Sequence, residues 1–236
     1  MEVRDILNDA IRYPLGNIKA VVIYLILSII LGAVVGGTVG GVVASASANN
    51  IIGAFGLSVA GVIIAIVIGF LIEGYRLDIV KYALVRDSDA PGIDFVRQFF
   101  DGIKLFIVEI IYYLIPIIIG AICSAIFREW LAYILLAIIF IIFGLAEVMA
   151  QCRLAKNDDL MSALSIGDAI ADISRVGFFK LVAVVVVLTI VAVVVVLIGG
   201  LISQWNGIVG GIISAILGVY LIFVTSRASG LLYSEV

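Results

Sequence analysis

Three glutamates lie within or beside long apolar stretches of this sequence, and they are its first candidates for chemistry. They are Glu73, Glu109 and Glu147, and each stands within a few residues of a lysine or an arginine. Ionisable groups inside a lipid bilayer are energetically costly and usually face the protein interior. Each of the three is therefore a candidate site residue.

The sequence leaves two interpretations of these carboxylates open. In the first, they line a polar cavity that opens to the cytoplasm. The residues of this candidate cavity are Glu73, Glu109, Glu147, Tyr24, Tyr112, Tyr113 and Gln151. In the second, the carboxylates reach the membrane interface or pair with nearby basic residues such as Arg76, three residues after Glu73.

Other kinds of chemistry have little support. The sequence has no histidine, which removes the most common metal ligand and general base, and a serine hydrolase triad with it. It also lacks a P-loop, a G-x-S-x-G elbow and an H-E-x-x-H motif. We therefore expect no metal, no cofactor and no catalytic residues, and an intramembrane enzyme is the least favoured function. A net charge of -3 argues against nucleic acid as a partner.

The elements that carry these residues are predicted to be membrane-spanning helices. Of the 236 residues, 64% are hydrophobic and only 13% are charged. Residues 20–72 and 181–226 contain no charge, and each run has room for two helices of the roughly 20 residues that a bilayer requires. The shorter runs 110–127 and 130–146 supply one helix each. The prediction is an all-α polytopic membrane protein with six transmembrane helices in a single integral membrane domain.

Orientation follows from the lysines and arginines between the apolar runs. Thirteen of the 14 fall on the side of the N-terminus, and only Arg128 falls on the other. Short loops rich in lysine and arginine stay in the cytoplasm. We therefore expect a plasma-membrane protein with both termini and both long connectors in the cytoplasm. The basic residues predicted at the interface are Arg76, Lys104, Arg153, Lys180 and Arg227.

A loose repeat precedes the first, third and fifth spans. An Asp-x-x-Arg pair is followed by a glycine and then a lysine, and each pair of spans closes on an arginine. The aspartates are Asp9, Asp94 and Asp172, the lysines Lys19, Lys104 and Lys180, and the arginines Arg76, Arg153 and Arg227. This predicts three hairpins inserted the same way round, over residues 3–76, 94–153 and 160–227, each preceded by an amphipathic cytoplasmic surface helix. Alternatively, the aspartates and arginines pair only locally on a solvated helix face.

Small residues in the spans indicate helix packing. Gly32, Gly36 and Gly40 recur every four residues, and Gly207 and Gly211 repeat that spacing. Such spacing allows a second helix to approach closely. The second helix belongs either to the same chain or to a second copy in a homo-oligomer.

The stretch between the second and third spans resembles a known family. It combines Gly74-Tyr75, an acidic connector with Pro91, Asp101-Gly102-x-Lys104 and the Tyr113-to-Pro116 segment. These features resemble an uncharacterised family of archaeal membrane proteins, domain of unknown function 4013. The family usually has an arginine where this chain has Asp78. The resemblance implies an archaeal plasma membrane and no particular activity.

Two functions remain from these observations. The first is a non-enzymatic membrane protein that organises lipid or serves as a subunit in a membrane complex. Its expected partners are the lipid bilayer and another membrane protein. The alternative is a transporter of a small or lipid-like solute, with Glu73, Glu109 and Glu147 around an acidic vestibule open to the cytoplasm.

Overall fold

The computed structural model describes residues 1–236, apart from the side chain of Ile208. In this described part all regular secondary structure is helical, with no strand. The helices are α1 (Val3–Gly16), α2 (Ile18–Ser47), α3 (Ile51–Leu84), α4 (Phe95–Ile126), α5 (Glu129–Asn157), α6 (Leu160–Leu164), α7 (Ile166–Val176), α8 (Phe178–Trp205) and α9 (Gly207–Tyr233).

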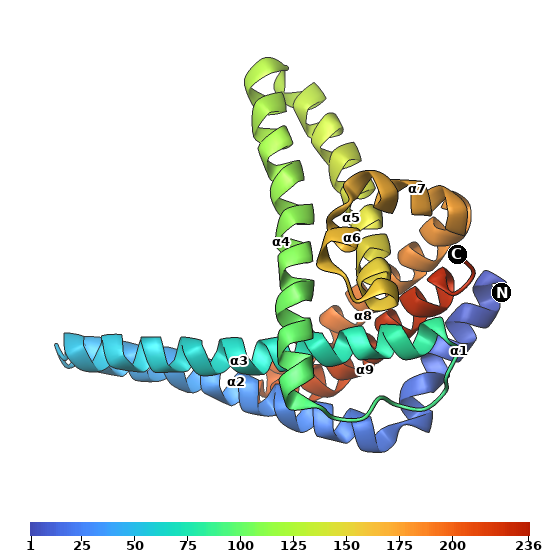
Figure 1. The fold of residues 1–236 in the computed structure, drawn as a ribbon. Helices are drawn as coiled ribbons and strands as arrows, with labels where there is room; N and C mark the ends of the chain where they lie inside the picture. Colours follow the sequence, from blue (N-terminus) through green and yellow to red (C-terminus); the bar gives the residue numbers. More distant parts are fainter.

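Six of these helices, α2, α3, α4, α5, α8 and α9, are long and apolar enough to cross a membrane. The prediction of an all-α chain with six membrane-length helices is thus confirmed. Consecutive helices pair into three hairpins, α2–α3, α4–α5 and α8–α9 (Figure 1). The tight turn between α2 and α3 is held by Asn50, whose side-chain oxygen accepts a hydrogen bond from the Gly53 N–H at 2.9 Å.

The core of the protein lies at one end of the hairpins. Apart from Pro116 and Ala132, every buried apolar side chain of the described residues falls within residues 1–24, 68–112, 145–188 and 219–236, which we call the hub. The hub contains α1, α6, α7 and the inner ends of the six long helices. Both chain termini lie in it (Figure 1), where the Met1 amino group pairs with Glu235.

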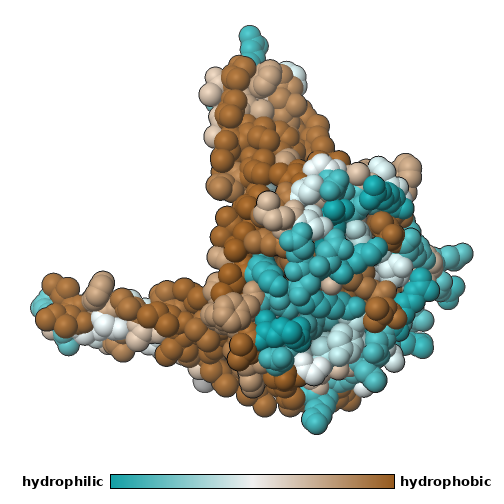
Figure 2. All heavy atoms as spheres, in the orientation of Figure 1, coloured by the Kyte–Doolittle hydropathy of each residue, from teal (hydrophilic) through white to brown (hydrophobic). Residues whose placement is uncertain are grey.

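Beyond the hub the α2–α3 and α4–α5 hairpins point in clearly different directions (Figure 1). Their surfaces are almost entirely apolar, whereas polar residues gather on the hub (Figure 2). In the most apolar window of α2, only 6% of the residues are buried. The outer parts of the hairpins, which we call the arms, are therefore covered by little protein other than their own hairpin partner.

The three segments predicted to precede the hairpins as amphipathic surface helices differ from one another in structure. α1 and α7 are separate helices, but they pack on α9 and α5 respectively, and Ile6 and Ala10 of α1 are fully buried in the hub core. No separate helix precedes the second hairpin, because α4 runs without a break from Phe95 to Ile126. Asp94 caps its start by accepting a hydrogen bond from the Arg97 N–H.

Two glycines fix the crossing of α3 and α4. A Cβ added at Gly74 would collide with the backbone of Gln98, and one added at Gly102 would collide with the backbone of Phe70. The two helix backbones are therefore in direct contact, which only glycine permits. This crossing sets the directions of the first two hairpins.

Candidate functional site

The three glutamates named above converge on one arginine. Glu73 and Arg76 come from α3, Glu109 from α4 and Glu147 from α5. Arg76 Nε lies 3.0 Å from Glu73 Oε2, and Arg76 Nη2 donates a short hydrogen bond to Glu109 Oε1. Glu147 interacts electrostatically with Arg76 and accepts a hydrogen bond from Gln151 Nε2. The cluster thus joins three spanning helices through one guanidinium group.

Very little space lies beside this cluster. A cavity of about 10 Å³ borders Glu147, with Tyr112 and Tyr113 in its wall. This is roughly the minimum volume that holds one water molecule. The Tyr112 hydroxyl is already engaged, because it donates a hydrogen bond to the Ala163 carbonyl oxygen at 3.1 Å. Of the two interpretations of the glutamates, the arrangement favours ion pairing over a solute vestibule.

A second polar network connects α3 to the start of α4, with Asp78 at its centre. Asp78 is only 1% exposed. Arg97 binds it with both terminal guanidinium nitrogens, at 2.8 Å for Nη2 to Oδ2, and Gln98 Nε2 donates to the same oxygen at 2.9 Å. Beside this pair, Lys81 Nζ donates to Asp101 Oδ2 at 2.8 Å. Bidentate arginine–carboxylate pairs are among the strongest polar contacts in proteins.

A third network connects α5, α7 and α9 through Asp172, which is fully buried. It accepts hydrogen bonds from Arg153 Nη1 at 2.9 Å, Arg175 Nη1 at 2.8 Å and the Tyr233 hydroxyl at 2.6 Å. Burial alone raises the pKa of this carboxyl group. The hydrogen bonds from Tyr233, Arg153 and Arg175 outweigh burial, and the pKa of Asp172 lies below its ordinary value of 3.8.

A fourth contact joins the two ends of the chain. Arg227 Nε of α9 donates to Asp9 Oδ1 of α1 at 2.8 Å, and Nη1 donates to the Asp87 carbonyl oxygen. The guanidinium also lies over the Tyr13 ring, 4.8 Å from its centroid. Although Arg227 opposes it, burial raises the pKa of Tyr13 to about 12. The sequence predicts an interface position for Arg227, but the side chain is only 2% exposed because these partners satisfy it inside the hub.

The lysines that precede the three hairpins have different partners. Lys104 binds Asp101 and Asp158, and Lys180 binds Glu235. The hydrogen bond from Lys104 lowers the pKa of Asp158 below its ordinary value. No carboxylate of the described residues lies within 4.0 Å of Lys19, although this lysine occupies the corresponding place before the first hairpin.

The glycines that the sequence singles out for packing face open space. A Cβ added at Gly32, Gly36 or Gly40 would have no neighbour within 4 Å, and the same holds for Gly207 and Gly211. Other glycines provide the close approaches within the arms. A Cβ at Gly41 would lie 3.1 Å from Leu57 Cδ1, and Gly61, Gly120, Gly199 and Gly210 also lie tightly against the facing helix of their hairpin.

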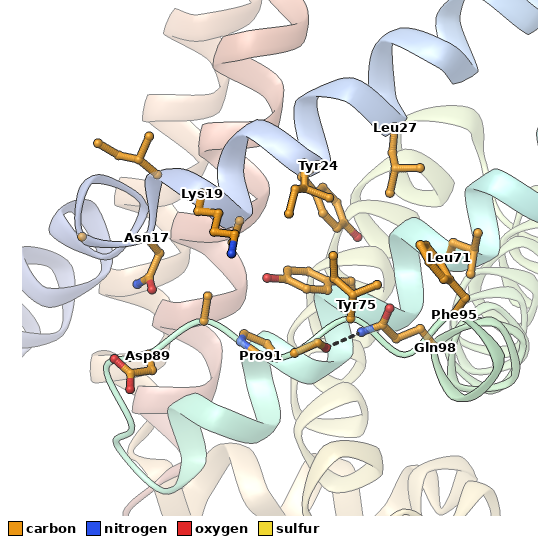
Figure 3. Close-up of a pocket in the computed structure, with 17 residues that line it drawn as sticks. Asn17, Lys19, Tyr24, Leu27, Leu71, Tyr75, Asp89, Pro91, Phe95 and Gln98 are labelled. Atoms are coloured by element: carbon orange, nitrogen blue, oxygen red, sulfur yellow. Dashed lines mark hydrogen bonds between the residues drawn. The ribbon is translucent and has the colours of Figure 1, made fainter.

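A cavity of about 530 Å³ lies away from the glutamates. It opens where the start of α2, the inner part of α3 and the 85–94 connector meet (Figure 3). Lys19, Asn17 and Gln98 contribute polar groups, and Leu27 and Leu71 line the side toward the arm. Tyr24, predicted to line a cavity with the glutamates, borders this cavity instead, and its hydroxyl donates to the Ile72 carbonyl oxygen.

Sequence reasoning missed Asp78, Arg97 and Gln98 as site residues. A signal for Asp78 exists, because it stands nine residues after Gly69, as Arg153 and Arg227 stand nine residues after Gly144 and Gly218. The position is easily missed because the corresponding residues of the other two hairpins are arginines. Among the described residues, no group of three or more cysteine, aspartate and glutamate side chains has a geometry that could hold a metal ion.

Comparison with known proteins gives a family but no activity. No curated protein matches the chain, and no solved structure matches it. The family described as protein of unknown function (DUF4013) matches residues 57–232, which include the glutamate cluster, the Asp78 network, Asp172 with Arg153 and Arg175, and Arg227. Because the match covers most of the chain, this protein belongs to the DUF4013 family of unknown function.

Proposed function

We propose that this protein is a non-enzymatic membrane scaffold that organises lipid between three arms fixed to one cytoplasmic hub. The observation that carries the proposal is that apolar hairpins extend beyond a single polar hub with little protein covering them. The first two point in clearly different directions (Figures 1 and 2), and Leu197, Leu201 and Trp205 are exposed on the third. Apolar surface that no protein covers must be covered by lipid or by a partner. In this proposal, lipid fills the spaces between the arms.

The lengths of the helices support this arrangement. α2 has 30 residues, which is about 45 Å at about 1.5 Å per residue. The hydrocarbon core of a bilayer is about 30 Å thick, so a helix of this length can cross with its ends in the headgroup regions and with a tilt of up to about 40°. Three hairpins that tilt outward from one hub diverge, so a spread arrangement and an intact bilayer are compatible.

The hub is proposed to be a cyclic repeat in which each hairpin is tied to the element that leads into the next. Arg153 pairs with Asp172, 19 residues later, and Asp78 pairs with Arg97, also 19 residues later, with the charges exchanged. Arg227 closes the series by pairing with Asp9 at the start of the chain. The closing residue of the first repeat in this proposal is Asp78 and not Arg76.

A cytoplasmic location for the hub is proposed on the basis of charge. All lysines and arginines except Arg128 belong to the hub or to its connectors, and Arg128 lies in the turn between α4 and α5 at the far end of an arm. The positive-inside rule then puts both termini in the cytoplasm, with the arms crossing the plasma membrane.

The transporter alternative has less support. A solute pathway needs room near its polar groups, and the glutamates leave about 10 Å³ and already engage Arg76. A role as a subunit of a complex remains a second candidate because of one feature. Gly32, Gly36 and Gly40 form an open stripe on α2 that a partner helix could approach closely.

Cysteine cross-linking in native membranes tests the proposal. With Cys123→Ala and Cys152→Ala as background, Gly41→Cys with Leu57→Cys should cross-link, because these positions touch within one arm. Gly36→Cys with Ile117→Cys, on two different arms, should not cross-link within one chain. Efficient cross-linking of that pair would refute separated arms. A cross-link between two chains at Gly36→Cys alone would support the subunit role instead.

A further inference from the structure

The 530 Å³ cavity beside Lys19 has the size and the two-sided character of a site for an amphiphile. Its volume lies in the usual range for small-molecule pockets, about 300–1,000 Å³. One side carries the polar groups of Asn17, Lys19 and Gln98, and the other carries Leu27 and Leu71 at the junction of the hub with the first arm. Residues 20–47 of α2 contain no charge, so the cavity lies where the hub meets the apolar arm.

The polar side of the cavity is suited to an anion. Figure 3 shows the Lys19 ammonium and the Tyr75 hydroxyl directed into the same part of the cavity. Neither group has a hydrogen-bond or ion-pair partner among the described residues, whereas Lys104 and Lys180 each bind a carboxylate. Ile18, Lys19 and Ala20 of the first turn of α2 also line this cavity, and N–H groups in a first helical turn lack acceptors within the helix.

One carboxylate also belongs to the cavity wall. Asp89 contributes to the lining, but Figure 3 shows its side chain turned away from Lys19. The backbone of Asp89 is fixed, since its carbonyl oxygen accepts a hydrogen bond from the Tyr13 hydroxyl at 3.2 Å and its N–H donates to Asp87 Oδ1 at 3.0 Å. The connector therefore holds this charge at the rim.

We propose that this cavity binds an anionic phospholipid, with the phosphate at Lys19 and Tyr75 and the first part of the hydrocarbon chain along Leu27 and Leu71. A lipid fits better than a free phosphate because most of the cavity lining is apolar and its apolar side continues into the arm. The site goes beyond the scaffold function, since lipid can fill the space between arms without any discrete headgroup site.

Native mass spectrometry of the full chain in mild detergent, titrated with phosphatidylglycerol, tests the site. Lys19→Gln should weaken the tightest binding about fivefold, the effect expected for one lysine near an anionic lipid. Lys19→Arg should retain binding. Lys180→Gln is the matched control, because it removes a lysine from the corresponding place before the third hairpin that already binds Glu235.

Three results would overturn the proposal. Equal affinity of Lys19→Gln and the unmodified protein would exclude Lys19 as the phosphate ligand. An equal loss in Lys180→Gln would indicate a non-specific charge effect. Glycerol 3-phosphate that competes as well as the lipid would identify a phosphate site in place of a lipid site. Ile23→Trp, which fills the apolar part of the cavity, should weaken phosphatidylglycerol binding while the thermal unfolding of the variant shows that it still folds.

Discussion

Arg227 of α9 and Asp9 of α1 form an ion pair with 2.8 Å between Nε and Oδ1, although 218 residues separate them in the chain. Arg227 is 2% exposed, whereas the Asp9 side chain is 41% exposed. The arginine therefore depends on this partner far more than the aspartate does. The pair attaches the third hairpin to the helix that leads into the first.

Asp9→Asn should destabilise the hub. The change leaves a buried guanidinium without its counter-charge, which costs about 3–5 kcal/mol in buried pairs. We expect roughly 3 kcal/mol, because the Asp87 carbonyl oxygen and the Tyr13 ring still contact Arg227. The free energy of unfolding in an SDS titration measures this loss. Asp5→Asn on the same helix is the control and should cost about 1 kcal/mol or less; equal losses in the two variants would contradict the assigned role of Asp9.

Asp78 and Arg97 should be energetically coupled. Asp78→Asn and Arg97→Gln each break the bidentate contact, but the double variant loses it only once. A double-mutant cycle on the free energy of unfolding should therefore give a coupling of about 1–2 kcal/mol. Strictly additive losses would mean that the contact contributes nothing to the hub.

Acid should remove the contribution of Asp172. Its folded-state pKa is depressed, so the stabilisation is present above the unfolded-state pKa and disappears as the pH falls through the folded-state value, below about pH 4. The difference in unfolding free energy between the unmodified protein and Asp172→Asn should therefore shrink between pH 5 and pH 3. A difference that stays constant over this range would contradict the pKa assignment.

Gly74→Ala should disturb the crossing of α3 and α4. A Cβ at Gly74 meets the backbone of Gln98, which cannot yield as a flexible side chain does. Overpacking of this kind costs about 1–3 kcal/mol. Gly69→Ala lies on the same helix with nothing within 4 Å and should be neutral or stabilising. If both variants unfold at the same temperature in detergent, the close crossing does not hold α3 and α4 together.

Much of this architecture can be predicted from the sequence because charge and hydrophobicity act locally. The charge-free run 20–72 is enough to place α2 and most of α3. The continuity of α3 to Leu84 is less apparent, because Arg76, Asp78 and Lys81 look like the end of a span until their partners are known.

Local sequence patterns cannot predict which charged residues of distant helices pair with each other. Arg153 is the basic residue nearest to Glu147 in the sequence, six positions later, but Arg153 binds Asp172 and Asp168. Likewise, Asp9 precedes Arg12 by one helical turn, yet it binds Arg227. These pairings follow from how α7 and α1 pack on the hub, which depends on the whole chain.

Distances between spin labels at the ends of the arms test most directly whether the hub keeps the arms apart in the membrane. Spin labels at Ala48→Cys and Arg128→Cys, in a chain with Cys123→Ala and Cys152→Ala, report on the first and second arms in lipid nanodiscs. Separated arms predict a distance beyond about 20 Å, twice the roughly 10 Å between packed helices. A narrow distribution near 10 Å would mean that the arms form one closed bundle, and the scaffold proposal would then be wrong.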